Sequence, residues 1–208
     1  MPRLLCIRVL VPCGVALLVL SGCLGSTPPT QFYLLPPLTS GDTASPASAG
    51  QRDLTLGVGP VTVPPYLDRP QIVTRTSRAK LVLADLDQWA APLPDTITRV
   101  LAENLSLLIP TERVVLHPWP RTTDPDYQVT VEVLQFDRGP GGQVVLVARW
   151  SLLDRDAKEL ALRTSRISQA AGGADYEATV TAMGRTLEVL AHDMAATLRS
   201  MPQPAPTR

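Results

Sequence analysis

The chain has 208 residues, enough for one domain or a tight pair of domains. Its 19 Lys and Arg residues equal its 19 Asp and Glu residues, and only 4% of the residues are aromatic. A nucleic-acid-binding protein needs a basic surplus or a set of stacking aromatic rings, so this composition argues against nucleic acid as a partner. The hydrophobic fraction of 45% is that of an ordinary globular protein.

Residues 1–22 have the parts of a secretory signal peptide. Arg3 and Arg8 make its start positive, and the apolar run 9–20 is shorter than the about 20 residues that a membrane-spanning helix needs. The usual A-x-A cleavage site is missing. Leu20-Ser21-Gly22-Cys23 stands in its place and resembles the lipobox of bacterial lipoproteins, in which the cysteine thiol carries a diacylglycerol. The alternative is a plain signal peptide followed by a chance cysteine.

Cys23 is the only cysteine that remains once the signal peptide is removed, since Cys6 and Cys13 lie inside it. A lone thiol in an exported protein needs a reason, and acylation supplies one. We therefore expect a covalent lipid, palmitate included, on Cys23 and no other cofactor. Residues 23–31 would form the lipidated N-terminus and tether. The residue after Cys23 is Leu24. An aspartate at this position would resemble an inner-membrane retention signal, so its absence favours the periplasmic face of the outer membrane.

Residues 32–200 are expected to form a single α+β domain, followed by a Pro-rich tail, 201–208. The apolar run Gln31–Leu35 is too short for a helix and predicts a strand. The segment 36–52 is rich in Pro, Ser, Ala and Gly and predicts a flexible loop. The alternation in Leu54–Val58 predicts a further strand.

A hairpin and the first helix are predicted next. Ile72–Thr74 and Lys80–Leu83 suit the two strands of the hairpin. Residues 92–108 repeat apolar side chains with the 3.6-residue period of a helix, and the prolines in the first turn cost no hydrogen bond. Trp89 precedes this helix and is expected to clamp the helix against the sheet as a core residue. Val114–Leu116 predicts a short strand.

The C-terminal half predicts three strands and a second helix. Three segments suit strands, because their apolar and polar residues alternate or because they follow turns: residues 127–133, 144–153 and 159–168. Their order is typical of an antiparallel meander, in which we expect Trp150 to face the core. Asp175 is a good N-cap for the last helix. The expected fold is thus α+β: a mainly antiparallel sheet with two amphipathic helices packed on one face.

The sequence offers little material for catalysis. It has no Gly-x-Ser-x-Gly elbow, and no free thiol once Cys23 is acylated. His117 and His192 are the only histidines, and they are interpreted as structural or surface residues. Asp85 and Asp87 could form a carboxylate pair for acid catalysis, but such residues beside a strand are more often solvated. We therefore predict no enzyme activity, no catalytic residue and no metal site.

A proline-framed loop, residues 64–71, is the candidate binding site. Its prolines fix φ and would hold the side chains between them in one pose. The candidate partner-binding residues are Tyr66, Leu67, Asp68 and Arg69. A rigid connector with no binding role is an equally good interpretation of the same residues.

Five motifs, taken in order, resemble a known family. They are the lipobox Cys23, Phe32-Tyr33-Leu34-Leu35, Tyr66-Leu67-Asp68-Arg69-Pro70-Gln71-Ile72-Val73, Trp89-Ala90-Ala91-Pro92-Leu93 with Leu101-Ala102-Glu103-Asn104-Leu105, and the strand pair that ends at Trp150. Together they resemble the PqiC-type (YmbA-like) ABC-transport auxiliary lipoproteins over nearly all of the mature chain.

This resemblance implies a non-enzymatic role. Such lipoproteins accompany MCE-domain proteins and membrane permease components that carry phospholipid or another lipid between the two membranes. The implied partners are those proteins and the lipid of the outer membrane, with a second copy of the chain as a further candidate. The alternative is a structural lipoprotein that supports the assembly or integrity of an outer-membrane complex without handling lipid.

Overall fold

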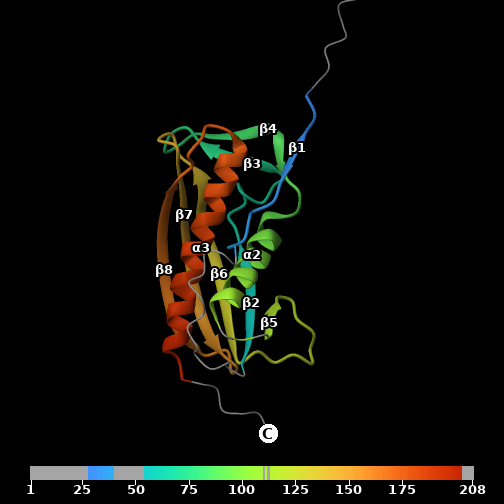
Figure 1. Ribbon diagram of the computed structural model, residues 1–208, viewed down its shortest axis with the longest axis vertical. Helices are drawn as coiled ribbons and strands as arrows, with labels where there is room; N and C mark the ends of the chain where they lie inside the picture. Colours follow the sequence, from blue (N-terminus) through green and yellow to red (C-terminus); the bar gives the residue numbers. More distant parts are fainter. Residues whose placement is uncertain (1–27, 40–53, 110, 112, 203–208) are drawn as a thin grey trace, which may run out of the picture. The chain divides into compact units, whose positions relative to one another are not determined.

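The computed structural model describes residues 28–39, 54–109, 111 and 113–202 (Figure 1). The compact unit that carries the helices and strands begins at Gln31. The predicted signal peptide, Cys23, most of the predicted loop 36–52 and the end of the Pro-rich tail lie outside the described residues.

Ten elements follow one another in the described residues. In chain order they are β1 (Gln31–Tyr33), β2 (Thr55–Thr62), β3 (Gln71–Arg75), β4 (Leu81–Trp89), α2 (Leu93–Leu108), β5 (Arg113–Leu116), β6 (Tyr127–Arg138), β7 (Gln143–Asp154), β8 (Glu159–Ala170) and α3 (Tyr176–Ser200). Each predicted strand and helix therefore has a counterpart, which confirms the α+β class.

The sheet is mixed, which corrects the prediction of a mainly antiparallel one. Strands β3–β4, β6–β7 and β7–β8 are antiparallel pairs, as the hairpin and the meander predicted. However, β1 lies parallel to β4, and β2 lies between β5 and β6, parallel to both. Leu56 of β2, for example, opposes Val114 on one side and Tyr127 on the other. Alternation identifies a strand, but it carries no information on the direction of a distant partner.

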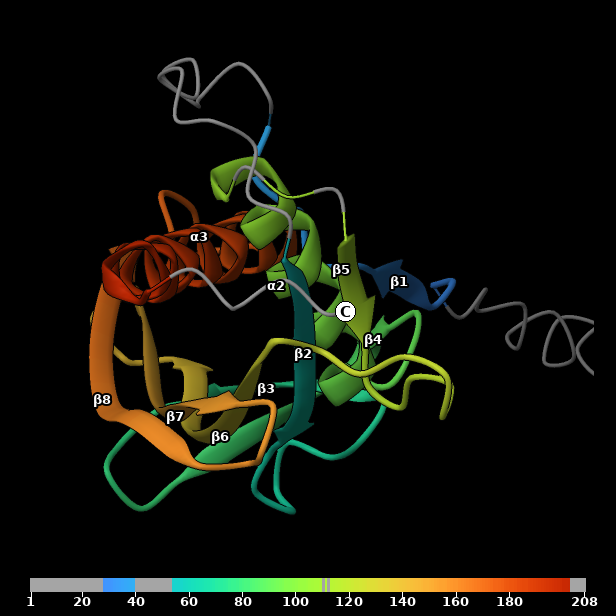
Figure 2. The same cartoon turned by 90° about the horizontal axis from the view of Figure 1, so that it is seen from below.

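Both helices lie on the same side of the curved sheet (Figure 2). Helix α2 packs on β2 and β5, α3 packs on β6, β7 and β8, and the two helices contact each other. Fully buried side chains fill the space between the layers, and they include Ile97, Leu101, Leu105, Val129, Leu146, Met183, Leu187 and Met194. The predicted arrangement of helices on one face is therefore confirmed.

The predicted helix ends are also confirmed. Prolines stand at the N-cap and in the first turn of α2, and the Asp175 carboxylate accepts a hydrogen bond of 2.7 Å from the Ala178 N–H at the start of α3. Neither helix of the described chain has the length and apolar content needed to cross a membrane.

The two tryptophans expected in the core are buried there. Trp89 is 6% exposed and Trp150 is 1% exposed. Trp89 is the last residue of β4, so it enters the core from a strand and not from a polar loop. The Trp150 indole N–H donates to the Ser165 hydroxyl on the neighbouring strand (3.2 Å).

Candidate functional site

Three of the sequence motifs meet at the C-terminal end of β4. The Trp89 N–H donates to the carbonyl of Pro70 (2.7 Å), and the Ala90 N–H donates to the carbonyl of Tyr33 (2.9 Å). Strand β1 therefore flanks this end of β4 on one side, and the end of the proline-framed loop flanks it on the other. We call Tyr33, Pro70, Trp89 and Ala90 the motif junction.

An N-terminal arm, residues 31–39, leads from β1 across the two helices. Figure 1 shows the arm passing from β1 toward α2 and α3. Leu35 and Leu38 are 1% and 7% exposed, and the Leu38 N–H donates to the side-chain carbonyl of the buried Asn104 in α2 (2.7 Å). The first four residues of the predicted flexible loop 36–52 are thus packed on the domain, which corrects that part of the prediction.

Gly184 of α3 makes room for this arm. A Cβ atom built at position 184 would lie 2.6 Å from the Cγ and 2.7 Å from the carbonyl oxygen of Pro36. Such distances are closer than van der Waals contact, so only glycine lets the arm lie against the helix here. This contact was not among the sequence predictions. The one signal for it in the sequence is a glycine inside an otherwise strong helix pattern. A glycine lowers helix stability, so its presence there points to a packing reason.

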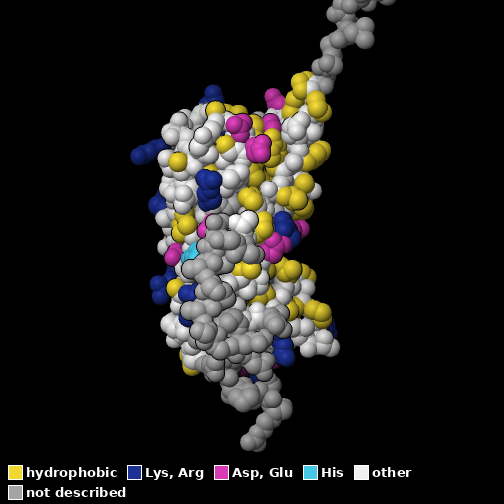
Figure 3. Space-filling model, viewed as in Figure 1, with side chains coloured by type: hydrophobic (Ala, Val, Ile, Leu, Met, Phe, Trp, Pro, Cys, Tyr) yellow, Lys and Arg dark blue, Asp and Glu magenta, His cyan; other side chains and the backbone are white. Residues whose placement is uncertain are grey.

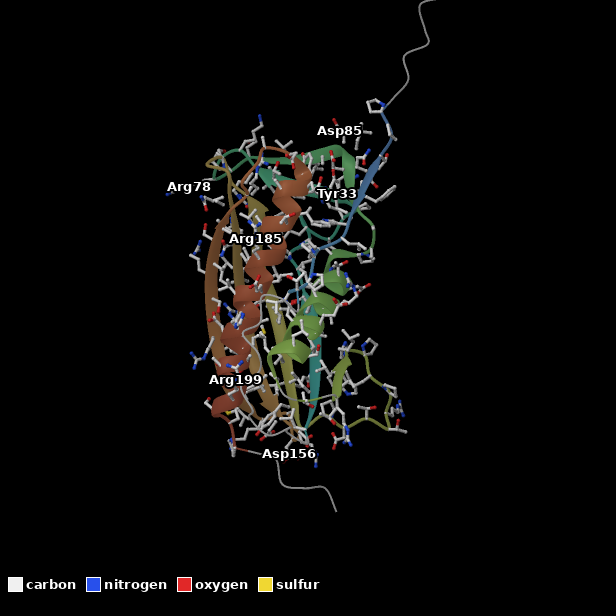
Figure 4. All side chains as sticks on the ribbon, in the orientation of Figure 1. Tyr33, Arg78, Asp85, Asp156, Arg185 and Arg199 are labelled. Atoms are coloured by element: carbon white, nitrogen blue, oxygen red, sulfur yellow. The ribbon has the colours of Figure 1, made fainter. Side chains whose placement is uncertain are left out.

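Tyr33 fixes the start of the arm through its side chain. Its hydroxyl donates to the Asp87 carboxylate in β4 (2.8 Å). That hydrogen bond, with burial and the negative charges of Asp87, Glu177 and Asp175, raises the pKa of Tyr33 from 10.0 to about 12. Asp85 also lies in β4, at the same end of the domain as Tyr33 (Figure 4). Asp87 is thus tied to the arm as a hydrogen-bond acceptor.

The proline-framed loop presents its four candidate residues in different ways. Leu67 is 2% exposed and belongs to the core, while Asp68 is exposed and Tyr66 and Arg69 are half-buried. The Leu67 N–H donates to the carbonyl of Pro64 (2.9 Å) and closes a turn. Leu67 is therefore the anchor of the loop and offers no side chain to a partner, which corrects its predicted role. The binding role of the other three residues stays a prediction.

A buried carboxylate that the sequence analysis missed holds Tyr66. Asp137 of β6 is fully buried and accepts hydrogen bonds from the Arg75 guanidinium (2.9 and 3.2 Å) and from the side-chain amide of Gln135 (2.9 Å). The guanidinium lies 5.9 Å from the centre of the Tyr66 ring, a cation–π distance, and the Tyr66 hydroxyl is 3.5 Å from the carboxylate. Burial raises the pKa of Tyr66, and the hydrogen bonds to Asp137 raise the pKa of Arg75.

A strand irregularity explains why Asp137 was overlooked. The register of β6 against β7 shifts between Val133 and Gln135, so the alternation read from the first half of β6 does not continue through its end. Asp137 also stands just before a glycine-rich turn, where an aspartate is normally exposed. Sequence patterns alone give no reason to bury it.

Arg69 carries an unsatisfied donor. Its Nε is buried and has no hydrogen-bond partner among the described residues, and no ion pair in that part of the chain joins it to Asp68. The turn is therefore held by Leu67 and by backbone hydrogen bonds. Buried donors without an acceptor are rare in folded proteins.

The two histidines lie at the surface of the domain. His117 and His192 are both exposed, and the His117 ring meets the Trp119 ring edge-on, with 5.4 Å between centroids. A Cβ atom built at Gly57 would lie 2.9 Å from the Trp119 ring, too close for a side chain. Gly59 has a φ of +108°, which favours glycine. The two glycines thus accommodate the loop after β5. In the described part of the chain, no three His, Cys, Asp or Glu side chains are grouped as a metal site would require.

The sequence is similar to known transport lipoproteins. Residues 33–195 match the family described as the ABC-type transport auxiliary lipoprotein component. Over 138 residues the chain is 36% identical to the "Intermembrane transport lipoprotein PqiC" of Escherichia coli (strain K12), which covers 66% of this chain and 71% of that protein. The protein of the same name from Shigella flexneri matches equally well.

Two crystal structures have a similar fold. One is of an uncharacterized protein, with a TM-score of 0.67, 23% identity and coverage of 82% of this chain and 99% of that one. The other is of a protein from Xanthomonas campestris, with a TM-score of 0.67, 18% identity and coverage of 81% and 94%. At these sequence identities the two structures support a similarity of fold alone.

Proposed function

Because this chain belongs to the family of ABC-type transport auxiliary lipoproteins, we propose that it is a non-enzymatic auxiliary component of an intermembrane lipid transport system of the MCE and ABC type. A lipid on Cys23 anchors it to the periplasmic face of the outer membrane. Its partners in this proposal are an MCE-domain protein and the membrane permease components of the same system.

The packed N-terminal arm is the observation that carries this proposal. Cys23 precedes Gln31 by only eight residues, and the arm that begins at Gln31 is held by β4, α2 and α3. A lipid anchor joined to a fixed arm limits the positions that the domain can take above a membrane. Such restriction suits a component that holds one end of a transport path, because it reduces the orientational freedom lost when a partner binds.

The use of charged side chains supports a non-enzymatic role. Two carboxylates that contact the sequence motifs are engaged in structural bonds, Asp87 with Tyr33 and Asp137 with Arg75. A catalytic carboxylate has to meet a substrate proton or bond, so carboxylates committed to hydrogen bonds within the fold are poor candidates.

We place the partner surface at the exposed part of the proline-framed loop. Asp68 is exposed and Arg69 is half-buried, so the two side chains offer opposite charges side by side at the surface of the loop. The loop is preorganised from both sides, since Leu67 anchors it in the core and Arg75 stacks on Tyr66. Preorganised loops lose little entropy on docking.

The alternative function is that of a structural lipoprotein that supports an outer-membrane assembly. One observation favours it. The groove of about 720 Å³ between β8 and α3 is lined largely by polar and charged side chains, among them Arg163, Thr164, Ser165, Arg166, Asp193 and Thr197. A lining of this kind does not suit acyl chains, so this groove gives the domain no way to carry lipid itself.

Two measurements test the proposal. In the first, Cys23→Ala should abolish labelling by a fatty-acid probe and leave unprocessed precursor, whereas unchanged labelling would remove the anchor from the proposal. In the second, photocrosslinking residues are placed at positions 68 and 69 and, as a control, at Asp156, which lies at the other end of the domain (Figure 4).

We expect crosslinks to an MCE-domain protein from positions 68 and 69 and none from position 156. Crosslinks only to other outer-membrane proteins would favour the structural alternative. If positions 68 and 69 give no crosslink in a protein that is acylated and folded, the loop is a connector.

A further inference from the structure

Strand β1 and the residue that follows it present two large apolar side chains to solvent. Phe32 is 64% exposed and Leu34 is 53% exposed. Residues two apart on an extended chain point to the same side, so these two side chains form one small apolar surface. We call Phe32 and Leu34 the arm patch. Figure 3 shows hydrophobic side chains gathered on the side of the domain where β1 lies.

The structure holds the arm patch outward. Tyr33, between the two, is fixed by its hydrogen bond to Asp87, and Leu35 is 1% exposed in the core. Turning Phe32 and Leu34 inward would require Tyr33 and Leu35 to turn outward, which breaks that hydrogen bond and exposes a buried leucine. The arm patch cannot bury itself within the domain, so it remains available to an external apolar partner.

The arm patch is close in sequence to the proposed anchor. Eight residues separate Gln31 from Cys23, and an extended chain spans at most about 3.5 Å per residue, so Gln31 can be no more than about 28 Å from an acylated Cys23. The segment from Val9 to Gly41 contains no Asp, Glu, Lys or Arg. No charged side chain along this segment therefore opposes its approach to a membrane.

We infer that the arm patch inserts into the boundary between the headgroups and the acyl chains of the membrane that carries the anchor. The inference rests on acylation of Cys23, as proposed above. A short linker gives effective concentrations of the order of mM, so the anchor favours an apolar contact that the free domain would make only weakly. An exposed phenylalanine and leucine are side chains that lie with their apolar part in this boundary.

The charges beside β1 set the lipid preference. Asp85, Asp87, Asp175 and Glu177 lie on the neighbouring β4 and at the start of α3, and three of them act on the pKa of Tyr33. Their negative charge repels anionic headgroups within a Debye length, about 10 Å at 0.1 M salt. Docking should therefore be stronger on phosphatidylethanolamine-rich bilayers than on phosphatidylglycerol-rich ones, and added salt should reduce the difference.

The test uses the absence of any free thiol in the mature acylated chain. Leu34→Cys is labelled with the environment-sensitive dye NBD in the full acylated protein, which is reconstituted at high dilution into vesicles of phosphatidylethanolamine and phosphatidylglycerol. The matched control is Leu162→Cys, because Leu162 is a leucine on the edge strand β8 and is 56% exposed, close to the 53% of Leu34. We expect a blue shift and quenching by spin-labelled lipid at position 34, with neither at position 162.

A second variant tests the energetics of the contact. Phe32→Ser should lower the quenching at position 34. In the non-acylated chain 24–208, which lacks the signal peptide, it should reduce vesicle binding by about tenfold, while the melting temperature stays that of the parent, since Phe32 is mostly exposed. Leu162→Ser should leave both quantities unchanged.

Three results would overturn the inference, and each is distinct from failure of the proposed function. If the protein floats with the vesicles but position 34 stays as aqueous as position 162, the arm patch does not insert. If protection at position 34 appears only at high protein-to-lipid ratio, a second copy covers it. If it appears only when a partner protein is added, that partner covers it. Failure of the acylated protein to float at all would instead refute the proposed anchor.

Discussion

The two halves of the sheet are built in different ways. On one side, β6, β7 and β8 form a meander in which each strand pairs with the next through a short turn. On the other side, the motif junction and the contacts around it join segments that are far apart in sequence: 54 residues separate Tyr33 from Asp87, 66 separate Leu38 from Asn104, and 71 separate Tyr66 from Asp137.

The two sides of the sheet depend on single contacts to different degrees. The meander is held by two long ladders of backbone hydrogen bonds that no single side chain controls. The junction side depends on a few side chains, because β1 is only three residues long and pairs with one neighbour. We therefore expect matched substitutions to cost more at the junction than on the exposed face of the meander, and the predictions below test this from the largest effect to the smallest.

Trp89→Ala should have the largest effect. Replacing a buried tryptophan by alanine leaves a cavity and costs about 3–5 kcal/mol. At about 2–4 °C per kcal/mol for a domain of this size, the melting temperature should fall by roughly 10 °C. Trp119→Ala, which removes a half-exposed tryptophan outside both halves, should cost clearly less. Equal losses for the two variants would show that Trp89 does not hold the junction.

Asp137→Asn and Glu132→Gln compare two ion pairs on one strand. Asp137 is fully buried and its partner Arg75 is 22% exposed, whereas Glu132 and its partner Arg149 are both 51% exposed. Loss of the buried charge should cost about 2 kcal/mol, less than for a fully buried pair because water reaches Arg75. Loss of the exposed one should cost at most about 0.5 kcal/mol. Chemical denaturation measures both, and a similar small cost at the two sites would contradict the comparison.

Gly184→Ala should release the N-terminal arm at a smaller cost in global stability. The added methyl group would overlap Pro36, and overpacking typically costs about 1–3 kcal/mol, offset by about 1 kcal/mol from the better helix propensity of alanine. The main readout is faster proteolysis within residues 31–39. Gly141→Ala is the control, because nothing lies within 4 Å of a Cβ there. An arm that stays protected in the Gly184 variant would show that Pro36 can move aside.

Tyr33 should give the smallest effect, visible only at high pH. Its pKa is raised from 10.0 to about 12 in the folded protein, so the neutral phenol is favoured by folding. The stabilisation is therefore complete below pH 10 and is lost as the pH rises through about 12. The stability of the parent minus that of Tyr33→Phe should decline across this window. Subtracting the stability of the variant removes the contributions of the other tyrosines. A difference in stability that does not change with pH would show that the hydrogen bond to Asp87 does not hold β1.

Several features could be predicted because their cause is local. The helix from residue 92 to 108, the Asp175 cap and the meander follow from periodicity, from capping chemistry and from turns, each of which acts over a few residues. The lone Cys23 after an apolar run, and the order of the five motifs, are likewise properties of the chain itself. From these the sequence led to the family and to the α+β class.

Part of the candidate site could not be predicted, because it is made of contacts between distant segments. The loop 36–52 appeared flexible by composition, yet Leu38 is buried since α2 and α3 offer it a place and a partner, Asn104. Leu67 appeared to be a binding residue, yet the loop turns it into the core. Burial of Asp137 required Arg75, 62 residues earlier, to reach it.

Patterns read along the chain were enough to predict the types and approximate positions of the elements, the anchor motif and the family. The tertiary structure alone decided that β1, β2 and β5 run parallel to their neighbours, that three motifs meet at the end of β4, and that Phe32 and Leu34 face outward. The physical reason is that side chains alternate in the same way in parallel and antiparallel strands. Their pairing is settled by which arrangement buries one common core and satisfies its polar groups.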